Sequence, residues 1–259
     1  FDMGIGGAGA ATLLSQCVGL TILTSFFLLK KGGLRVTPAR VSRSPRIYLA
    51  ILKQGMPSFF RQGVLSGSTM ALNYNAKLFG DAAVAALSIV GKVFMVIQSV
   101  VIGFGQGFQP VLGYNYGAGR LDRVKQAVWF SVKTCTVILT CAAAAGFILS
   151  PHIITLFRRD DAMVIDIGTR AFRWQCLTLP LGAVLVFANM FFQSLGKSWR
   201  AVILAVCRQG LYIPLVYLLT SRAGLAGLER SQACADLLAF LLSAGVMAHY
   251  FKTEFGAES

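Results

Sequence analysis

Charged side chains are scarce in this sequence. Its 259 residues include 24 Lys and Arg but only 10 Asp and Glu, and charged residues make up 13% of the chain where an average soluble domain has about a quarter. The two histidines, His152 and His249, lie far apart in the sequence. No loop combines an acid, a base and a nucleophile, which argues against a hydrolase and against other enzymes that rely on an acid–base cluster.

Paired ligands for a metal ion are also missing. The six cysteines stand at positions 17, 135, 141, 176, 207 and 234, each within an apolar stretch and none at the spacing of a zinc site. Gly103, Gly105 and Gly107 form no nucleotide-binding loop, because no strand precedes them and no Gly-Lys-Ser/Thr follows. We therefore expect no metal, no bound cofactor and no ATP-driven pump.

Long apolar runs are what the sequence does contain. Hydrophobic residues make up 56% of the chain, and the mean hydropathy is +0.67. Uncharged runs extend over Met3–Leu29, Val93–Gly119, Thr134–Phe157 and Trp174–Gly196. Each is at or beyond the roughly 20 residues that a helix needs to cross a bilayer. Helices of a soluble protein would be interrupted by polar faces, so the predicted fold class is an all-α, polytopic membrane protein.

Seven crossings are predicted, and their flanking charges orient them. The segments are residues 5–29, 57–79, 82–113, 127–149, 166–195, 200–220 and 225–250. Seven basic residues and no acid lie between the first two: Lys30, Lys31, Arg35, Arg40, Arg43, Arg46 and Lys53. Because basic loops stay in the cytoplasm, this loop should be inside, with the first residue outside and the last inside.

The remaining loops agree with this orientation. The same side receives Arg120, Arg123, Lys125, Lys197, Arg200 and Lys252, and the outer side receives Lys77, Arg158, Arg159, Arg222 and Arg230. Thirteen basic residues inside against five outside fit a multi-pass protein of the cell membrane. The net charge of +14 then needs no nucleic acid partner, because the charges lie in short loops facing one leaflet.

The crossing number is odd and the chain starts at Phe1, which suggests a fragment of a longer protein. At an offset of 220, Gly4, Gly7 and Gln16 match Gly224, Gly227 and Asp236, a weak repeat that chance could equally produce. We expect residues 1–29 to be the last helix of a missing N-terminal lobe, 30–54 a basic cytoplasmic linker, and 55–259 a six-helix C-terminal lobe.

Three segments resemble one transporter family. They are GMPSFFRQ at 55–62, GFGQGFQPVLGYNYGAGRLDRV at 103–124 and FDMGIGGAGAAT at 1–12, and they are similar to multidrug and toxic compound extrusion (MATE) transporters of the bacterial multidrug exporter branch. The resemblance implies a twelve-helix exporter built from two six-helix lobes. Such a protein expels small organic cations by alternating access, driven by a proton or sodium gradient. The missing N-terminal lobe and the lipid bilayer are then the partners of this chain.

Three polar stripes are candidates for a substrate cavity. Their members recur at helical spacing: Gln62, Ser66, Thr69 and Asn73 on the second crossing; Lys92, Ser99, Gly103, Gln106 and Pro110 on the third; and Gln175, Gly182, Asn189 and Gln193 on the fifth. Polar groups in a membrane helix turn away from lipid. They could line a cavity, or they could join neighbouring helices at about 0.6 kcal/mol for each hydrogen bond.

Aromatic and Met side chains accompany these stripes: Phe94, Met95, Phe187, Met190 and Phe191. Ring faces and polarizable thioethers suit flat lipophilic cations, although packing is the more common role for each of these side chains taken singly. Phe94 and Phe187 are the two that we expect to line the cavity.

Three charges lie deep in the predicted membrane region. Arg208 lies about eight residues into its helix, roughly 12 Å from the inner surface, and Asp236 should lie at a similar depth in the next helix. Because unpaired charges are costly there, we expect Arg208 and Asp236 to form an ion pair. The pair could simply hold the helices in register, or Asp236 could release Arg208 and bind the coupling ion. Lys92 could repel cations or be the partner of Asp236 instead.

Family members that use sodium carry acids within the helices matching the second and fifth crossings. Here no acid lies between Arg61 and Lys77, and the fifth crossing has only Asp166, near its outer end, which weakens a sodium site of that type. Asp2, at the outer mouth of the first helix, could shape that loop or join a site completed by the missing lobe. A lipid-linked saccharide flippase of a related type is the main alternative function, since Lys92 and Arg208 would suit its more cationic cavity; a membrane-embedded enzyme is a weaker one.

Overall fold

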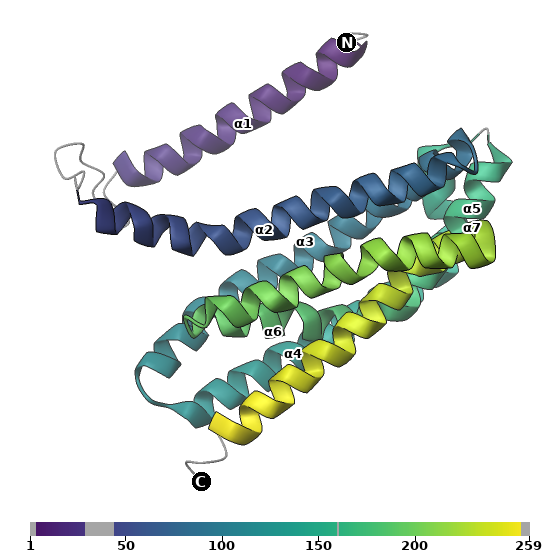
Figure 1. Ribbon diagram of the computed structural model, residues 1–259. Coiled ribbons are helices and arrows are strands. Elements are labelled where there is room, and N and C mark those ends of the chain that lie inside the picture. The colour runs from purple at the N-terminus through teal and green to yellow at the C-terminus, as the bar shows by residue number, and fades with distance from the viewer. Residues whose placement is uncertain (1–3, 29–43, 160, 255–259) are drawn as a thin grey trace. The chain divides into compact units, whose positions relative to one another are not determined.

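The computed structural model describes residues 4–28, 44–159 and 161–254, and all of the regular structure within these ranges is helical. The elements in chain order are α1 (Gly4–Leu28), α2 (Pro45–Lys77), α3 (Asp81–Gly117), α4 (Leu121–Phe157), α5 (Ala162–Thr178), the 3-10 turn η2 (Leu179–Leu181), α6 (Gly182–Ser194) and α7 (Ser198–Glu254) (Figure 1). The predicted all-α class is confirmed.

Several helices are long and apolar enough to cross a membrane. In the described ranges these are Asp81–Gly117, Leu121–Phe157, Ala162–Ser194 and Trp199–Thr253, and α1 contains a shorter apolar stretch, Gly9–Ile22. Many large apolar side chains on them are exposed, among them Val96, Ile148 and Leu156. Such a surface is unfavourable in water and suits lipid, so the chain is a polytopic helical membrane protein.

The second predicted crossing begins earlier than expected. Helix α2 starts at Pro45, twelve residues before the predicted boundary at 57, so residues 45–54 are helical although we assigned them to the linker. A proline in the first helical turn needs no hydrogen-bond acceptor and already has a helical φ, which favours a helix start there. The rest of the linker before residue 44, and Asp2, lie outside the described residues.

One break lies within a predicted crossing and another lies between two of them. The fifth, residues 166–195, corresponds to α5, η2 and α6, and the 3-10 turn contains Pro180, which lacks an N–H group for the helix ladder. The sixth and seventh together form α7, which is interrupted at Gly224, with φ 59° and ψ −136°. A residue with a side chain rarely adopts this conformation, and the break falls where a turn was predicted, between 220 and 225.

The chain divides into two compact units, Phe1–Ile51 and Leu52–Ser259. The first contains α1 and the first turns of α2. In the second, α6 packs on α7, α4 packs on α5, and α3 packs on α4, α5 and α6. Fully buried aromatic rings form its core, namely Phe172, Phe187, Phe191 and Phe192. The candidate site residues all belong to this second unit.

Candidate substrate-facing surface and buried ion pair

The polar stripe on α2 faces away from the helices that pack against it. Gln62, Ser66, Thr69 and Asn73 are all exposed. The Ser66 and Thr69 hydroxyls donate to carbonyl groups one turn earlier in α2 itself. The opposite face of α2 is the packed one: Ser68 is buried and its Oγ donates to the Gln209 carbonyl oxygen of α7 over 3.0 Å. Within the described residues, this stripe joins no other helix.

Helix α3 repeats this arrangement. Its stripe of Lys92, Ser99, Gly103, Gln106 and Pro110 is exposed along its whole length. The buried residues of α3 lie on the other face and include Val90, Val101, Phe108 and Leu112. Side chains at spacings of three, four and seven share a helix face, so the packed and polar faces stay separate for several turns. The consecutive helices α2 and α3 thus each present an exposed polar stripe.

The stripe on the fifth crossing behaves differently and joins helices. The Asn189 Nδ2 donates to the Ala201 carbonyl oxygen at the start of α7 over 2.6 Å, and Gln193 Nε2 donates to Asn189 Oδ1 over 3.0 Å. Gln109 of α3 extends this chain by donating its Nε2 to Gln193 Oε1 over 3.2 Å. Gly182 is buried, and the Gln175 Oε1 atom is buried without a hydrogen-bond partner in the described part of the chain. The hydrogen bonds of Asn189 and Gln193 link α6 to α7 and α3, so of the two roles considered for these residues, joining helices agrees with the structure.

The aromatic candidates are mostly core residues. Phe187 is 0% exposed and packs edge-to-face on Phe104 and Phe108, with ring centroids 5.9 and 5.3 Å away. Our expectation that Phe187 lines a cavity is therefore wrong for this conformation, because α3 covers its ring. Phe94 is half-buried against the same core, and Met95 beside it is exposed.

The predicted ion pair between Arg208 and Asp236 is present. The Arg208 Nε donates to Asp236 Oδ1 over 2.8 Å, and the two side chains are 19% and 4% exposed. Gln232, one turn before Asp236, donates its Nε2 to the same oxygen over 3.3 Å. Both partners belong to α7, on opposite sides of the Gly224 break, so the pair joins the two segments of this helix. Lys92 is exposed on α3 and is not the partner of Asp236.

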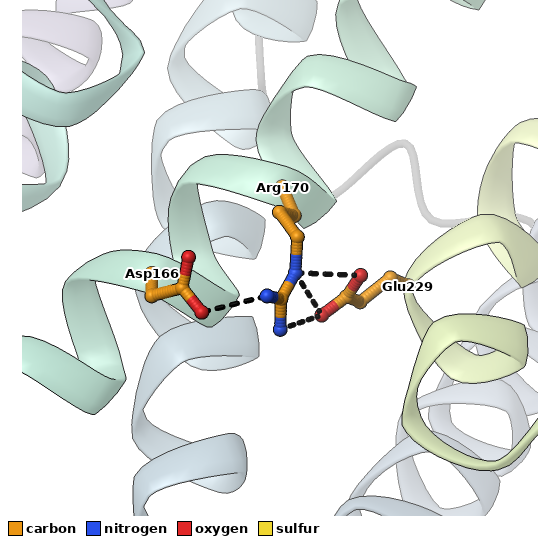
Figure 2. Close-up of polar contacts among 3 residues, drawn as sticks. All are labelled: Asp166, Arg170 and Glu229. Atoms are coloured by element: carbon orange, nitrogen blue, oxygen red, sulfur yellow. Dashed lines mark hydrogen bonds and ion pairs between the residues drawn. The ribbon is translucent and has the colours of Figure 1, made fainter.

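A second charged network was missed by the sequence reasoning. Arg170 of α5 lies between Asp166 and Glu229 (Figure 2): its Nη1 is 2.6 Å from Asp166 Oδ2, and its Nη2 is 3.1 Å from Glu229 Oε1. The Arg170 Nε also donates to Glu229 Oε1 over 3.1 Å. Glu229 is buried and lies just after the Gly224 break, so the network ties α5 to the second segment of α7.

The i, i+4 spacing of Asp166 and Arg170 was a signal that could have revealed half of this network. Glu229 gave no such signal, because its partner lies 59 residues away.

No three His, Cys, Asp or Glu side chains come together as a metal-binding group in the described part of the chain.

These features define a class of protein: a multi-pass helical membrane protein whose packed lobe presents polar helix faces outward. The MatE family model matches residues 57–218, which is more than half of the sequence, and the chain belongs to this family. The predicted family resemblance is thereby confirmed.

Curated relatives include the multidrug export protein MepA of Staphylococcus aureus strain NCTC 8325 and that of Staphylococcus saprophyticus. Each is 22% identical over 241 residues, an alignment that covers 93% of this chain and 53% of the relative. The chain spans about half the length of the curated relatives it matches.

Solved structures share the fold. A MOP superfamily transporter from Pyrococcus furiosus aligns with a TM-score of 0.82 and 22% identity, over 93% of this chain and 55% of that one. A mutant of the Vibrio cholerae MATE transporter VcmN aligns with a TM-score of 0.82 and 20% identity, over 98% and 57%. An outward-facing multidrug resistance MATE transporter gives a TM-score of 0.83 at 23% identity, over 97% and 58%.

Proposed function

We propose that this chain is the C-terminal part of a secondary active antiporter, which exports cationic drugs or toxic organic compounds in exchange for protons or sodium. Membership of the MatE family and the multidrug export relatives support this proposal. The missing partner is an N-terminal lobe whose last helix is α1, and the linker after α1 tethers the two lobes at the inner surface of the cell membrane. The whole protein of which this chain is a part is then a transporter and not an enzyme.

The observation that carries the proposal is the pair of exposed polar faces on α2 and α3. On α3 the stripe lies opposite a packed face, and on α2 it lies away from the buried Ser68, Ala71 and Asn75; among the described residues neither stripe forms a hydrogen bond to another helix. In a bilayer, polar groups at these positions require a water-filled cavity or a polar partner. A second lobe placed over these faces supplies both, and rocking of the lobes exposes the cavity to each side in turn.

Side chains beside the stripe suit the proposed substrates. Met95 is 71% exposed and precedes Ser99 by one turn on α3, and half-buried Phe94 lies next to it. A polarizable thioether and an aromatic ring favour flat cations, while Gln62, Asn73 and Gln106 supply hydrogen bonds without adding charge.

The ion pair on α7 is the proposed coupling site. Asp236 is the more deeply buried partner, and its Oδ1 accepts from both Arg208 and Gln232. If the two segments of α7 shift against each other during transport, Asp236 loses Arg208 and can take up a proton or a sodium ion instead. The purely structural role of the pair is the alternative, and flux measurements on an Asp236 variant separate the two.

A dye accumulation assay tests the transport proposal. Cells that express the full-length protein should retain less of a fluorescent lipophilic cation than cells without it, and collapse of the ion gradient should abolish the difference. The isolated 259-residue chain should not export dye, because half of the cavity is absent. Coupled efflux by the isolated chain would contradict the two-lobe account.

Lys92 supports a second candidate function. This cation lies within the exposed stripe of α3, where it would attract an anionic headgroup and repel a cationic drug. A flippase for lipid-linked saccharides would use it in this way. Movement of a fluorescent lipid-linked saccharide across the bilayer of proteoliposomes, without export of the cationic dye, would favour this function over drug export.

A further inference from the structure

An open groove of about 860 Å³ runs between α3 and α4, outside the ion pairs and the polar network described above. Its volume falls within the range of about 300–1,000 Å³ that is typical of ligand sites. On α3 the lining extends from Gly103 to Asn115, about 18 Å of helix, and on α4 from Arg123 to Ser131. The two helices are antiparallel neighbours, so Asn115 and Arg123 lie at the same end of the groove.

The floor and walls of the groove are apolar. Phe104 and Phe108 line the α3 side, and Phe130 lines the α4 side. Gly103 and Gly107 face the open space of the groove, because an added Cβ at either position would meet no atom within 4 Å. The middle and the far end of the groove therefore offer a hydrocarbon-compatible surface.

The near end is polar and positively charged. Arg123 and Gln126 line it together with Asn115, whose Nδ2 already donates to the Val111 carbonyl oxygen of its own helix. Among the described residues no acid lines the groove, since Asp122 next to Arg123 does not belong to the lining. Within the described ranges Arg123 forms no salt bridge. The guanidinium thus keeps its hydrogen-bond donors for a ligand, and a guanidinium matches a phosphate group well.

We propose that this groove binds an anionic phospholipid of the inner leaflet, with the phosphate at Arg123 and Gln126 and an acyl chain along Phe104, Gly107 and Phe108. The expected topology places this end at the cytoplasmic surface, which carries anionic lipids and attracts basic residues. The same charge disfavours a cationic substrate in the groove. Most of the lining is separate from the proposed transport cavity. Gly103 belongs to the α3 stripe, whereas the stripe does not include Phe104, Phe108 or the lining residues of α4.

Photolabelling tests the proposal. The protein is reconstituted into phosphatidylcholine nanodiscs that contain a small share of photoreactive phosphatidylglycerol, and crosslinked peptides are identified by mass spectrometry. Crosslinks should concentrate on the 103–131 region. Arg123→Gln should lower the labelling about fivefold, in line with the contribution of one basic residue near an anionic leaflet.

Two matched controls accompany this variant. Arg120→Gln removes a charge at the N-cap of α4, three residues before Arg123 and outside the lining, and it should leave the labelling within about twofold of wild type, because a charge outside the groove adds only a screened attraction. Gly107→Leu fills the groove and should reduce labelling as strongly as Arg123→Gln, whereas Gly91→Leu, at an exposed and open position of the same helix, should not. Circular dichroism of each variant confirms that its helices are intact.

Equal labelling of the Arg123→Gln and Arg120→Gln variants would overturn the proposal, and so would equal labelling by photoreactive phosphatidylcholine. Labelling of the groove by a photoreactive lipophilic cation, in place of the anionic lipid, would show that it holds substrate and would also overturn the proposal. Failure of these experiments leaves the export proposal intact, since dye accumulation is measured independently.

Discussion

Arg208 and Asp236 form a hydrogen-bonded ion pair across the break in α7, with Nε and Oδ1 2.8 Å apart. Twenty-eight residues separate them, and the conformation of Gly224 allows the two helical segments to fold back and bring them together. The pair therefore depends on a backbone conformation as well as on the two side chains.

Removal of one partner should destabilise the lobe. Asp236→Asn leaves the Arg208 charge buried without an acid, and loss of a buried partner costs roughly 3–5 kcal/mol. The double variant Arg208→Gln/Asp236→Asn should recover part of this loss, because no unpaired charge remains. Thermal unfolding of the detergent-solubilised protein measures both, and purely additive effects of the two substitutions would contradict a direct interaction.

The same substitution should also affect coupling. In the full-length protein, Asp236→Asn should uncouple drug movement from proton or sodium flux, because an amide cannot exchange Arg208 for a cation. Drug-driven ion flux in proteoliposomes is the measurement, with Asp161→Asn, at the cap of α5, as a variant outside the pair. Coupling that persists in Asp236→Asn would restrict the pair to a structural role.

The two acids around Arg170 should differ in their contribution to stability. Glu229 has a side chain that is 3% exposed, and that of Asp166 is 63% exposed. Glu229→Gln weakens a buried charged contact and should cost roughly 1–3 kcal/mol, whereas Asp166→Asn should cost less than about 1 kcal/mol. Thermal unfolding of both variants at low and high salt measures the two losses of stability, and salt should screen the exposed Asp166 pair. A larger effect of Asp166→Asn would mean that the surface pair, and not the link to α7, stabilises α5.

Gly224 should tolerate no side chain without strain. At φ 59° and ψ −136°, Gly224→Ala should lower the free energy of unfolding by roughly 1–3 kcal/mol, because an L-residue is disfavoured in this region. Gly91→Ala is the control, since Gly91 lies in the body of α3 with open space at its Cβ position and should gain roughly 0.5–1 kcal/mol. Equal stability of the two variants would mean that the break does not require glycine.

The exposed stripe of α3 should matter for transport but not for folding. Gln106→Leu in the full-length protein should slow dye export on the order of tenfold, the change expected from the loss of a hydrogen bond or two to substrate or water. Ile102→Leu, an exposed apolar neighbour on α3, should transport normally. A normal export rate of Gln106→Leu would remove Gln106 from the proposed cavity.

Sequence reasoning reached the ion pair on α7 because depth in a membrane can be counted along the chain. Each residue of a helix rises by a fixed amount, so two charges at equal depth in consecutive crossings are natural partners. The stripes on α2 and α3 were found through helical spacing in the same way. Helical spacing could not show that Asn189 joins α6 to α7 while the polar residues of α2 and α3 stay exposed. Periodicity predicts which residues share a helix face, but it does not predict which neighbouring helix packs on that face.

The sequence by itself determined the membrane class, since bilayer thickness sets the length of an apolar run, and its motifs identified the family. Only the tertiary structure decided that Phe187 belongs to the core, that Arg170 reaches Glu229, and that the stripes of α2 and α3 have no partner in the described lobe. Each of these depends on which helix lies beside which, and that follows from side-chain packing between segments far apart in the sequence.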